Sequence, residues 1–176
     1  MKGELNGRRC FMGLDYFSTE FDSGGKGEDL SKKVCAEFGS SASKDKVLDP
    51  HGSTGYKINN KMQDGRNLNV YFLPKVSSLQ GISDKMIVWS YITPVDSIPP
   101  DKKENVLMRL LAINIESDTC AVGVNKSNYI MVKAERVLAG LDQRELKEMI
   151  KATFSVAQKL HMDVFPEYNI KTVLEE

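Results

Sequence analysis

Few side chains in this 176-residue sequence are of the types that carry out catalysis, and they are far apart along the chain. The two histidines are His51, in an Asp-Pro-His-Gly segment, and His161, near the end of the last apolar periodic segment. A nucleophilic or metal site built on them would have to unite distant loops. We therefore interpret both as solvated side chains, and we predict a protein that is not an enzyme and has no catalytic residue, metal or cofactor.

The segment Gly24-Gly25-Lys26-Gly27 is the pattern that most suggests anion binding. Backbone amides at the start of a helix attract phosphate groups, and a helix is expected from residue 29. The spacing Gly-x-x-x-x-Gly-Lys-Ser/Thr of a nucleotide-binding loop is absent, and no strand precedes the glycines. The alternative hypothesis is a regulatory protein that binds a nucleotide or another small ligand, or a minor enzyme, using this loop and Lys26. A structural subunit of a larger complex is the third hypothesis.

The three cysteines, Cys10, Cys35 and Cys120, are widely spaced and odd in number. Neither a disulfide framework nor a zinc site is indicated, and this favours a reducing compartment. Cys35 falls on the apolar side of an expected helix, where a small buried side chain fits better than a nucleophile.

Charge and hydropathy argue against two classes of partner. Lys plus Arg and Asp plus Glu are each 24, so no global field favours nucleic acid. Residues 1–11 lack the apolar core of a signal peptide, and no apolar run approaches the ~20 residues that span a bilayer. Trp89 and Tyr91 could stack on bases, but their strand lacks basic residues, so core packing is expected. We expect a cytoplasmic protein without a nucleic-acid or membrane partner.

Apolar periodicity predicts one α+β domain. Helices are expected over 29–39, 101–115 and 142–160, and strands over 56–60, 68–73, 85–92, 120–124 and 129–133. These elements predict a mainly antiparallel five-stranded sheet with three helices, in the order α-β-β-β-α-β-β-α. The strand 85–92 is apolar at nearly every position, so we place it centrally, covered on both faces. Residues 1–28 are expected to be an irregular leader, 29–162 the domain, with a surface connection at 40–55, and 163–176 a partly ordered tail.

Two local signals fix element ends. Asp64-Gly65 is typical of a hairpin turn. Asp142 with Glu145 three residues later forms a capping-box pattern, which predicts the start of the last helix.

The helix 101–115 carries more apolar surface than one sheet face can cover. Its apolar side chains span an arc of roughly 220° on the helical wheel, broken by Asn114. The excess predicts that a second surface covers part of this helix.

The C-terminal half resembles the class I type III secretion chaperone-like superfamily, which includes a bacterial family of sensory-transduction regulators. The resemblance is carried by residues 104–111 (ENVLMRLL), 120–124 (CAVGV), 129–133 (YIMVK) and 141–146 (LDQREL). It implies a small cytoplasmic homodimer that holds an extended segment of a partner and has no catalytic activity.

The resemblance also assigns surfaces. The second helix of such proteins contributes to the dimer interface, which agrees with the wide arc and predicts an interface of Val106, Leu110 and Leu111, with Leu107 shared between core and interface. Bound segments lie over the first helix and the sheet, so the candidates for partner contact are Leu30, Val34 and Phe38. The leading hypothesis is a homodimeric, chaperone-like module that binds a protein or peptide.

Overall fold

The computed structural model of the chain describes residues 26–39, 42–45, 55–75 and 84–172. Within them a six-stranded antiparallel sheet has the order β1-β2-β3-β4-β6-β5. The strands are β1 (Ala42–Asp45), β2 (Gly55–Lys61), β3 (Asn67–Lys75), β4 (Lys85–Pro94), β5 (Ala121–Val124) and β6 (Tyr129–Val137). The main helices are α1 (Lys26–Phe38), α2 (Lys103–Glu116) and α3 (Gln143–Lys159). The predicted α+β class, the three helices and their order with the five predicted strands are confirmed.

The sixth strand, β1, lies inside the segment 40–55 that was predicted to be a surface connection. It pairs with β2 from Ala42↔Ile58 to Asp45↔Gly55. Its sequence, ASKD, has no apolar alternation, so no periodic signal could reveal it. It is an edge strand, where short polar sequences are common.

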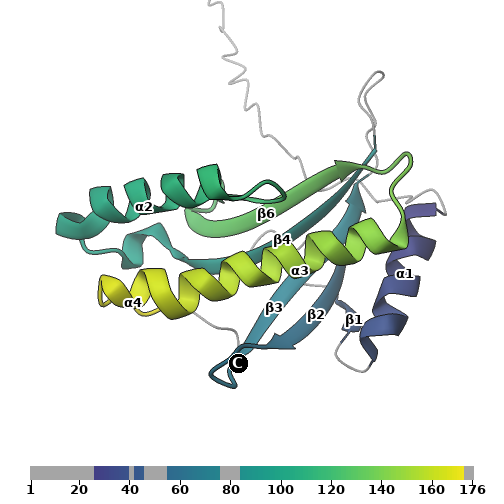
Figure 1. Cartoon of the computed structure of the whole chain (residues 1–176), viewed down its shortest axis with the longest axis horizontal. Coiled ribbons are helices and arrows are strands. Elements are labelled where there is room, and N and C mark those ends of the chain that lie inside the picture. The colour runs from purple at the N-terminus through teal and green to yellow at the C-terminus, as the bar shows by residue number, and fades with distance from the viewer. Residues whose placement is uncertain (1–25, 40–41, 46–54, 76–83, 173–176) are drawn as a thin grey trace, which may run out of the picture.

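The helices pack on one face of the sheet, and α3 runs across the front of it between α1 and α2 (Figure 1). One core joins this sheet face to all three helices. Alternate residues of β3 point into it, as period-two strand geometry requires, and Leu68, Val70 and Phe72 are buried. Strand β4 lies between β3 and β6, as predicted for the most apolar strand.

Two predicted local signals are confirmed. Gly65 has a φ of 83° in the turn between β2 and β3, a backbone conformation that glycine adopts without steric cost. At the start of α3, the backbone N–H of Glu145 donates to Asp142 Oδ1 at 2.8 Å, and the N–H of Asp142 donates to Glu145 Oε2 at 3.1 Å. The reciprocal pair satisfies amides that the first helical turn leaves without partners.

The core extends past residue 162, where the domain was expected to end. The chain continues from α3 through a π-helical turn, η4 (Leu160–Val164), and a short helix, α4 (Phe165–Glu167). Val164, Phe165 and Ile170 are buried with the core. Pro166 lies in the first turn of α4, where proline is tolerated.

Removing the cap of α3 should lower stability. We expect Asp142→Ala to reduce the free energy of unfolding by about 1 kcal/mol, because the Glu145 amide loses its acceptor. Urea denaturation followed by circular dichroism measures this. Ser155→Ala, at an exposed position of the same helix, is the control, and an equal effect of both substitutions would contradict the role of the cap.

Candidate interaction surfaces

Helix α2 presents two apolar stripes on opposite sides. Val106, Leu110 and Ile113 face the sheet and are buried, with exposed fractions of 0%, 5% and 2%. The predicted interface residues Val106 and Leu110 therefore belong to the chain's own core, and that part of the prediction needs correction. The sequence showed how wide the apolar arc of α2 is, but not which part of the arc the sheet would cover.

The outer stripe consists of Met108, Leu111 and Ile115, which are 61%, 57% and 86% exposed. Their spacing of three and four residues places them on one side of the helix. Leu111 was predicted as an interface residue and lies on this stripe. Leu107, predicted to be shared, is half-buried and packs against the core. Met108 and Ile115 were part of the predicted arc but were not singled out, because periodicity alone does not show which apolar residues stay exposed.

Asn114, which interrupts the apolar arc, binds the edge strand β5. Its Nδ2 donates to the carbonyl oxygen of Val122 at 2.8 Å, and its Oδ1 accepts from the backbone N–H of Val122 at 2.6 Å. Because β5 is at the edge of the sheet, these two backbone groups would otherwise face an added strand. The side-chain amide takes the place of a neighbouring strand at this residue. At Val122 the edge of β5 is therefore already occupied.

The opposite face of the sheet carries a second apolar cluster, which we call the aromatic face. It contains Tyr71, Leu73 and Trp89 at 2%, 5% and 5% exposure, with half-buried residues packed against them, namely Ile87, Tyr91 and Met131. The rings of Tyr71 and Trp89 are stacked with centroids 5.7 Å apart, and Tyr91 makes an edge contact with Tyr129 at 5.9 Å. Beside it, hydrogen bonds from Lys133 and Lys85 lower the pKa of Glu135 to about 2.

The three residues of α1 that were predicted to contact a partner differ in their exposure. Val34 is fully buried in the core, so it is not available for a surface contact. Leu30 and Phe38 are half-buried and pack against the core, and they retain some exposed area. Burial, followed by the negative charge of Glu28, raises the pKa of Cys35 to about 11, so this thiol stays protonated at neutral pH.

The structure gives a packing role to Gly27, the last glycine of the candidate anion-binding segment. A Cβ atom at this position would lie 2.7 Å from Pro74 Cβ and 2.9 Å from a methyl group of Leu138. Glycine is therefore required for close contact between α1 and the end of β3. Gly24, Gly25, Cys10 and His51 lie outside the described residues. Within the described ranges, no group of three or more His, Cys, Asp or Glu side chains could hold a metal ion. None of the described helices is long and apolar enough to cross a bilayer.

An open groove of about 760 Å³ separates the end of β6 from the start of α3. Charged side chains of both signs line it, among them Arg136, Glu145 and Glu148. Lys85 and Thr119 also line it, and none of its described lining residues is a cysteine, serine or histidine.

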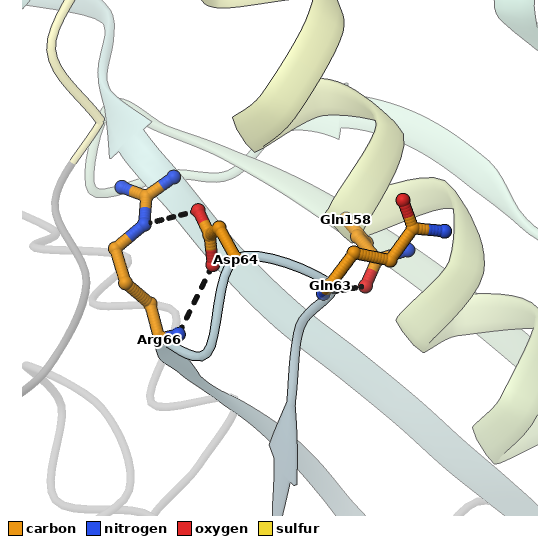
Figure 2. A network of polar contacts seen from close by, with 4 residues as sticks. All are labelled: Gln63, Asp64, Arg66 and Gln158. Atoms are coloured by element: carbon orange, nitrogen blue, oxygen red, sulfur yellow. Dashed lines mark hydrogen bonds and ion pairs between the residues drawn. The ribbon is translucent and has the colours of Figure 1, made fainter.

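His161 is buried rather than solvated, which corrects the sequence-based interpretation. It lies in η4 with an exposed fraction of 1%, and neither ring nitrogen has a hydrogen-bond partner within the described part of the chain. In the adjacent β2–β3 turn, Nε of Arg66 donates a hydrogen bond to the carboxylate of Asp64. The backbone N–H of Gln63 donates to Oε1 of Gln158 in α3 at 3.1 Å (Figure 2). Burial, together with the positive charge of Arg66, lowers the pKa of His161 to about 4. The backbone of Tyr91 and the charge of Asp64 oppose this shift weakly.

Comparisons with known proteins give a likeness of shape only. No protein-family model matches the sequence, and no curated protein matches it. A chain in the crystal structure of the ExsC–ExsE complex is similar at 12% identity and a TM-score of 0.49, over 77% of this chain and 91% of that chain. A chain in the HopA1–SchA chaperone–effector complex has 14% identity and a TM-score of 0.43, over 74% and 89%.

The third similar structure is that of the Yersinia pestis type III secretion chaperone SycH in complex with a stable fragment of YscM2, at 10% identity and a TM-score of 0.44, over 75% and 97%. Two of the three complexes contain proteins named as chaperones, the class that the sequence resembles. At these identities and TM-scores the similarity does not assign a function. The function is therefore argued from the surfaces of this chain.

Removing the Asn114 amide should destabilise the edge of the sheet. We expect Asn114→Ala to lower the free energy of unfolding by about 1–3 kcal/mol, because two backbone groups of Val122 lose their partners. Asn105→Ala, an exposed position on the same helix, corrects for the higher helix propensity of alanine. Urea denaturation compares the two variants, and equal stabilities would show that the amide does not protect the edge.

His161 should make stability depend on pH. The unfolded chain binds a proton near pH 6.5, whereas the folded chain resists protonation until about pH 4. Stability therefore falls as pH falls from about 6.5 to 4, by about 1.4 kcal/mol per pH unit and roughly 3 kcal/mol in total.

His161→Leu tests this contribution, because leucine fills a similar volume and does not titrate. Between pH 7 and 5 the wild type should lose about 2 kcal/mol more stability than this variant. Chemical denaturation at a series of pH values gives the difference. Met162→Leu, at the next position of η4, removes no titratable group and is the control that should keep the wild-type dependence, while a wild-type dependence in His161→Leu would contradict the assignment.

Proposed function

We propose that this chain is a non-enzymatic, chaperone-like protein-binding module that works as a homodimer. The observation that carries the proposal is the outer stripe of α2, in which Met108, Leu111 and Ile115 are all more than half exposed. Large apolar side chains that are gathered on one exposed side of a helix are typical of interaction sites rather than of a free surface. Burying them against a partner removes apolar area from water, which favours association.

The partner that fits first is a second copy of the chain. A two-fold dimer joins the same patch of both subunits, so an apolar stripe on one copy meets an equal apolar stripe on the other. The Asn114 amide leaves the helix face, and not the strand at Val122, as the contact surface. The superfamily that the sequence resembles also implies dimerisation through this helix. Leu111 is the predicted interface residue that remains after Val106 and Leu110 are assigned to the core.

The second part of the proposal is that the dimer holds an extended segment of another protein over α1 and the sheet. The sequence resemblance supports this role, and Leu30 and Phe38 are the candidate contacts that keep exposed area. The alternative, a regulator that binds a nucleotide or small ligand, is less well supported because Gly27 is occupied in packing against Pro74 and Leu138.

Charge on the outer stripe should dissociate the dimer. We expect the wild type to sediment as a dimer at micromolar concentration and Leu111→Asp to sediment as a monomer. A two-fold dimer carries the substitution twice, so about 2 kcal/mol per side chain raises the dissociation constant on the order of 1,000-fold. Leu111 is 57% exposed, so the fold should be retained, which circular dichroism checks.

The matched control is Ser155→Asp, which adds the same charge at an exposed position of α3. It should remain a dimer. A wild-type chain that sediments as a monomer, or a Leu111→Asp variant that still dimerises, would exclude the outer stripe as a dimer interface.

A further inference from the structure

The aromatic face is buried although no described element lies over it. Its members all belong to β3, β4 and β6, and the described helices pack on the other side of the sheet. Tyr71 and Trp89 nevertheless have exposed fractions of only 2% and 5%. Neighbours on the same sheet face shield the edges of a large ring, but they leave its upper surface open. A covering layer is therefore needed beyond the described helices and strands.

The indole N–H of Trp89 indicates that the covering layer is a segment of polypeptide. Its indole Nε1 is buried and has no hydrogen-bond partner among the described residues. Buried donors in folded proteins are nearly always paired, and a tryptophan N–H is a donor only. A segment of backbone lying over the ring supplies carbonyl acceptors together with apolar side chains.

The N-terminal 25 residues of the chain are attached at the rim of this face. The first described residue is Lys26, at the start of α1. Gly27 packs against Pro74, whose side chain lies on the helix side of the sheet, and the next residue back, Leu73, points to the aromatic face, so the segment before Lys26 has to pass around the end of β3. At ~3.3 Å per extended residue, a segment of ten residues spans roughly 33 Å, which is longer than the whole of β3. Residues before Lys26 can therefore reach every part of the aromatic face.

The N-terminal segment also has the matching composition. It contains all the Phe and Tyr residues that lie outside the described ranges, which are Phe11, Tyr16, Phe17 and Phe21. In an extended chain Met12, Leu14 and Tyr16 would share one side and Phe11 and Phe17 the other, so charges at both Leu14 and Phe17 would alter each side. Aromatic rings pair favourably with one another in stacked or edge-on contacts.

We propose that residues 11–17 bind the aromatic face of their own chain as an intramolecular ligand. The interaction surface is formed by Tyr71, Leu73 and Trp89, and its occupant is the apolar stretch FMGLDYF. This inference is independent of the proposed homodimer, because the outer stripe of α2 is made of other residues. It gives the N-terminal leader, which periodicity could not assign to an element, a defined place in the fold.

Trp89 is the only tryptophan in the chain, so its fluorescence reports on the aromatic face directly. In the full-length chain we expect the double substitution Leu14→Asp, Phe17→Asp to shift its emission to longer wavelength and to raise its quenching by acrylamide several-fold. Gly3→Asp, Gly7→Asp adds the same charge to the same segment outside residues 11–17 and should leave both quantities unchanged. A synthetic peptide of residues 9–19, added to the Leu14→Asp, Phe17→Asp variant, should reverse the shift.

Emission of Trp89 that is equal in the wild type and the Leu14→Asp, Phe17→Asp variant would overturn the proposal, as would long-wavelength emission in the wild type. A photo-reactive side chain at position 14 tests it without destabilising charges. Cross-links should fall on peptides of β3 or β4 that contain Tyr71 or Trp89, and cross-links confined to α2 or α3 would overturn it. The Leu14→Asp, Phe17→Asp variant should still sediment as a dimer, because its substitutions lie outside the outer stripe of α2. A failure of this proposal can thereby be distinguished from a failure of the proposed homodimer.

Discussion

The requirement to cover β4 on both faces governs the organisation of this protein. This strand has apolar side chains at almost every position and lies between β3 and β6. One of its faces belongs to the main core, which the sheet forms together with α1, α2 and α3, and α3 is the helix that packs on β4. Its other face, around Trp89, is buried as well. A sheet of this kind is stable only if apolar layers lie on both sides, because an exposed central strand would leave much of its apolar area in water.

The helix layer covers one face of the sheet, but it leaves a further apolar surface exposed. Helix α2 uses Val106, Leu110 and Ile113 to cover the sheet, yet it carries Met108, Leu111 and Ile115 on its far side. A helix that only covered a sheet would be expected to carry polar residues there. The far side is therefore the observation on which the proposed homodimer depends.

Local chemistry in the sequence predicted local structure well, and long-range packing less well. Asp142 and Glu145 fix the start of α3 through hydrogen bonds over three residues, so their pattern could be interpreted without the fold. The polar strand β1 exists through its pairing with β2, and nothing in its own residues indicates it. The orientation of α2 and the burial of His161 depend on neighbours far away in sequence. For the same reason two of the predicted interface residues, Val106 and Leu110, lie in the core, and the exposure of Met108 and Ile115 was not predicted.

The Asn114 amide also limits how copies of this chain can assemble. Strand-to-strand addition at a sheet edge has no natural end, because each added copy offers a new edge to the next one. Contact through helix side chains around a two-fold axis uses up the surface on both copies and is complete at two. By occupying the backbone of Val122, one asparagine within the apolar arc of α2 opposes strand addition at this residue of β5, whereas the pair proposed through the outer stripe is closed.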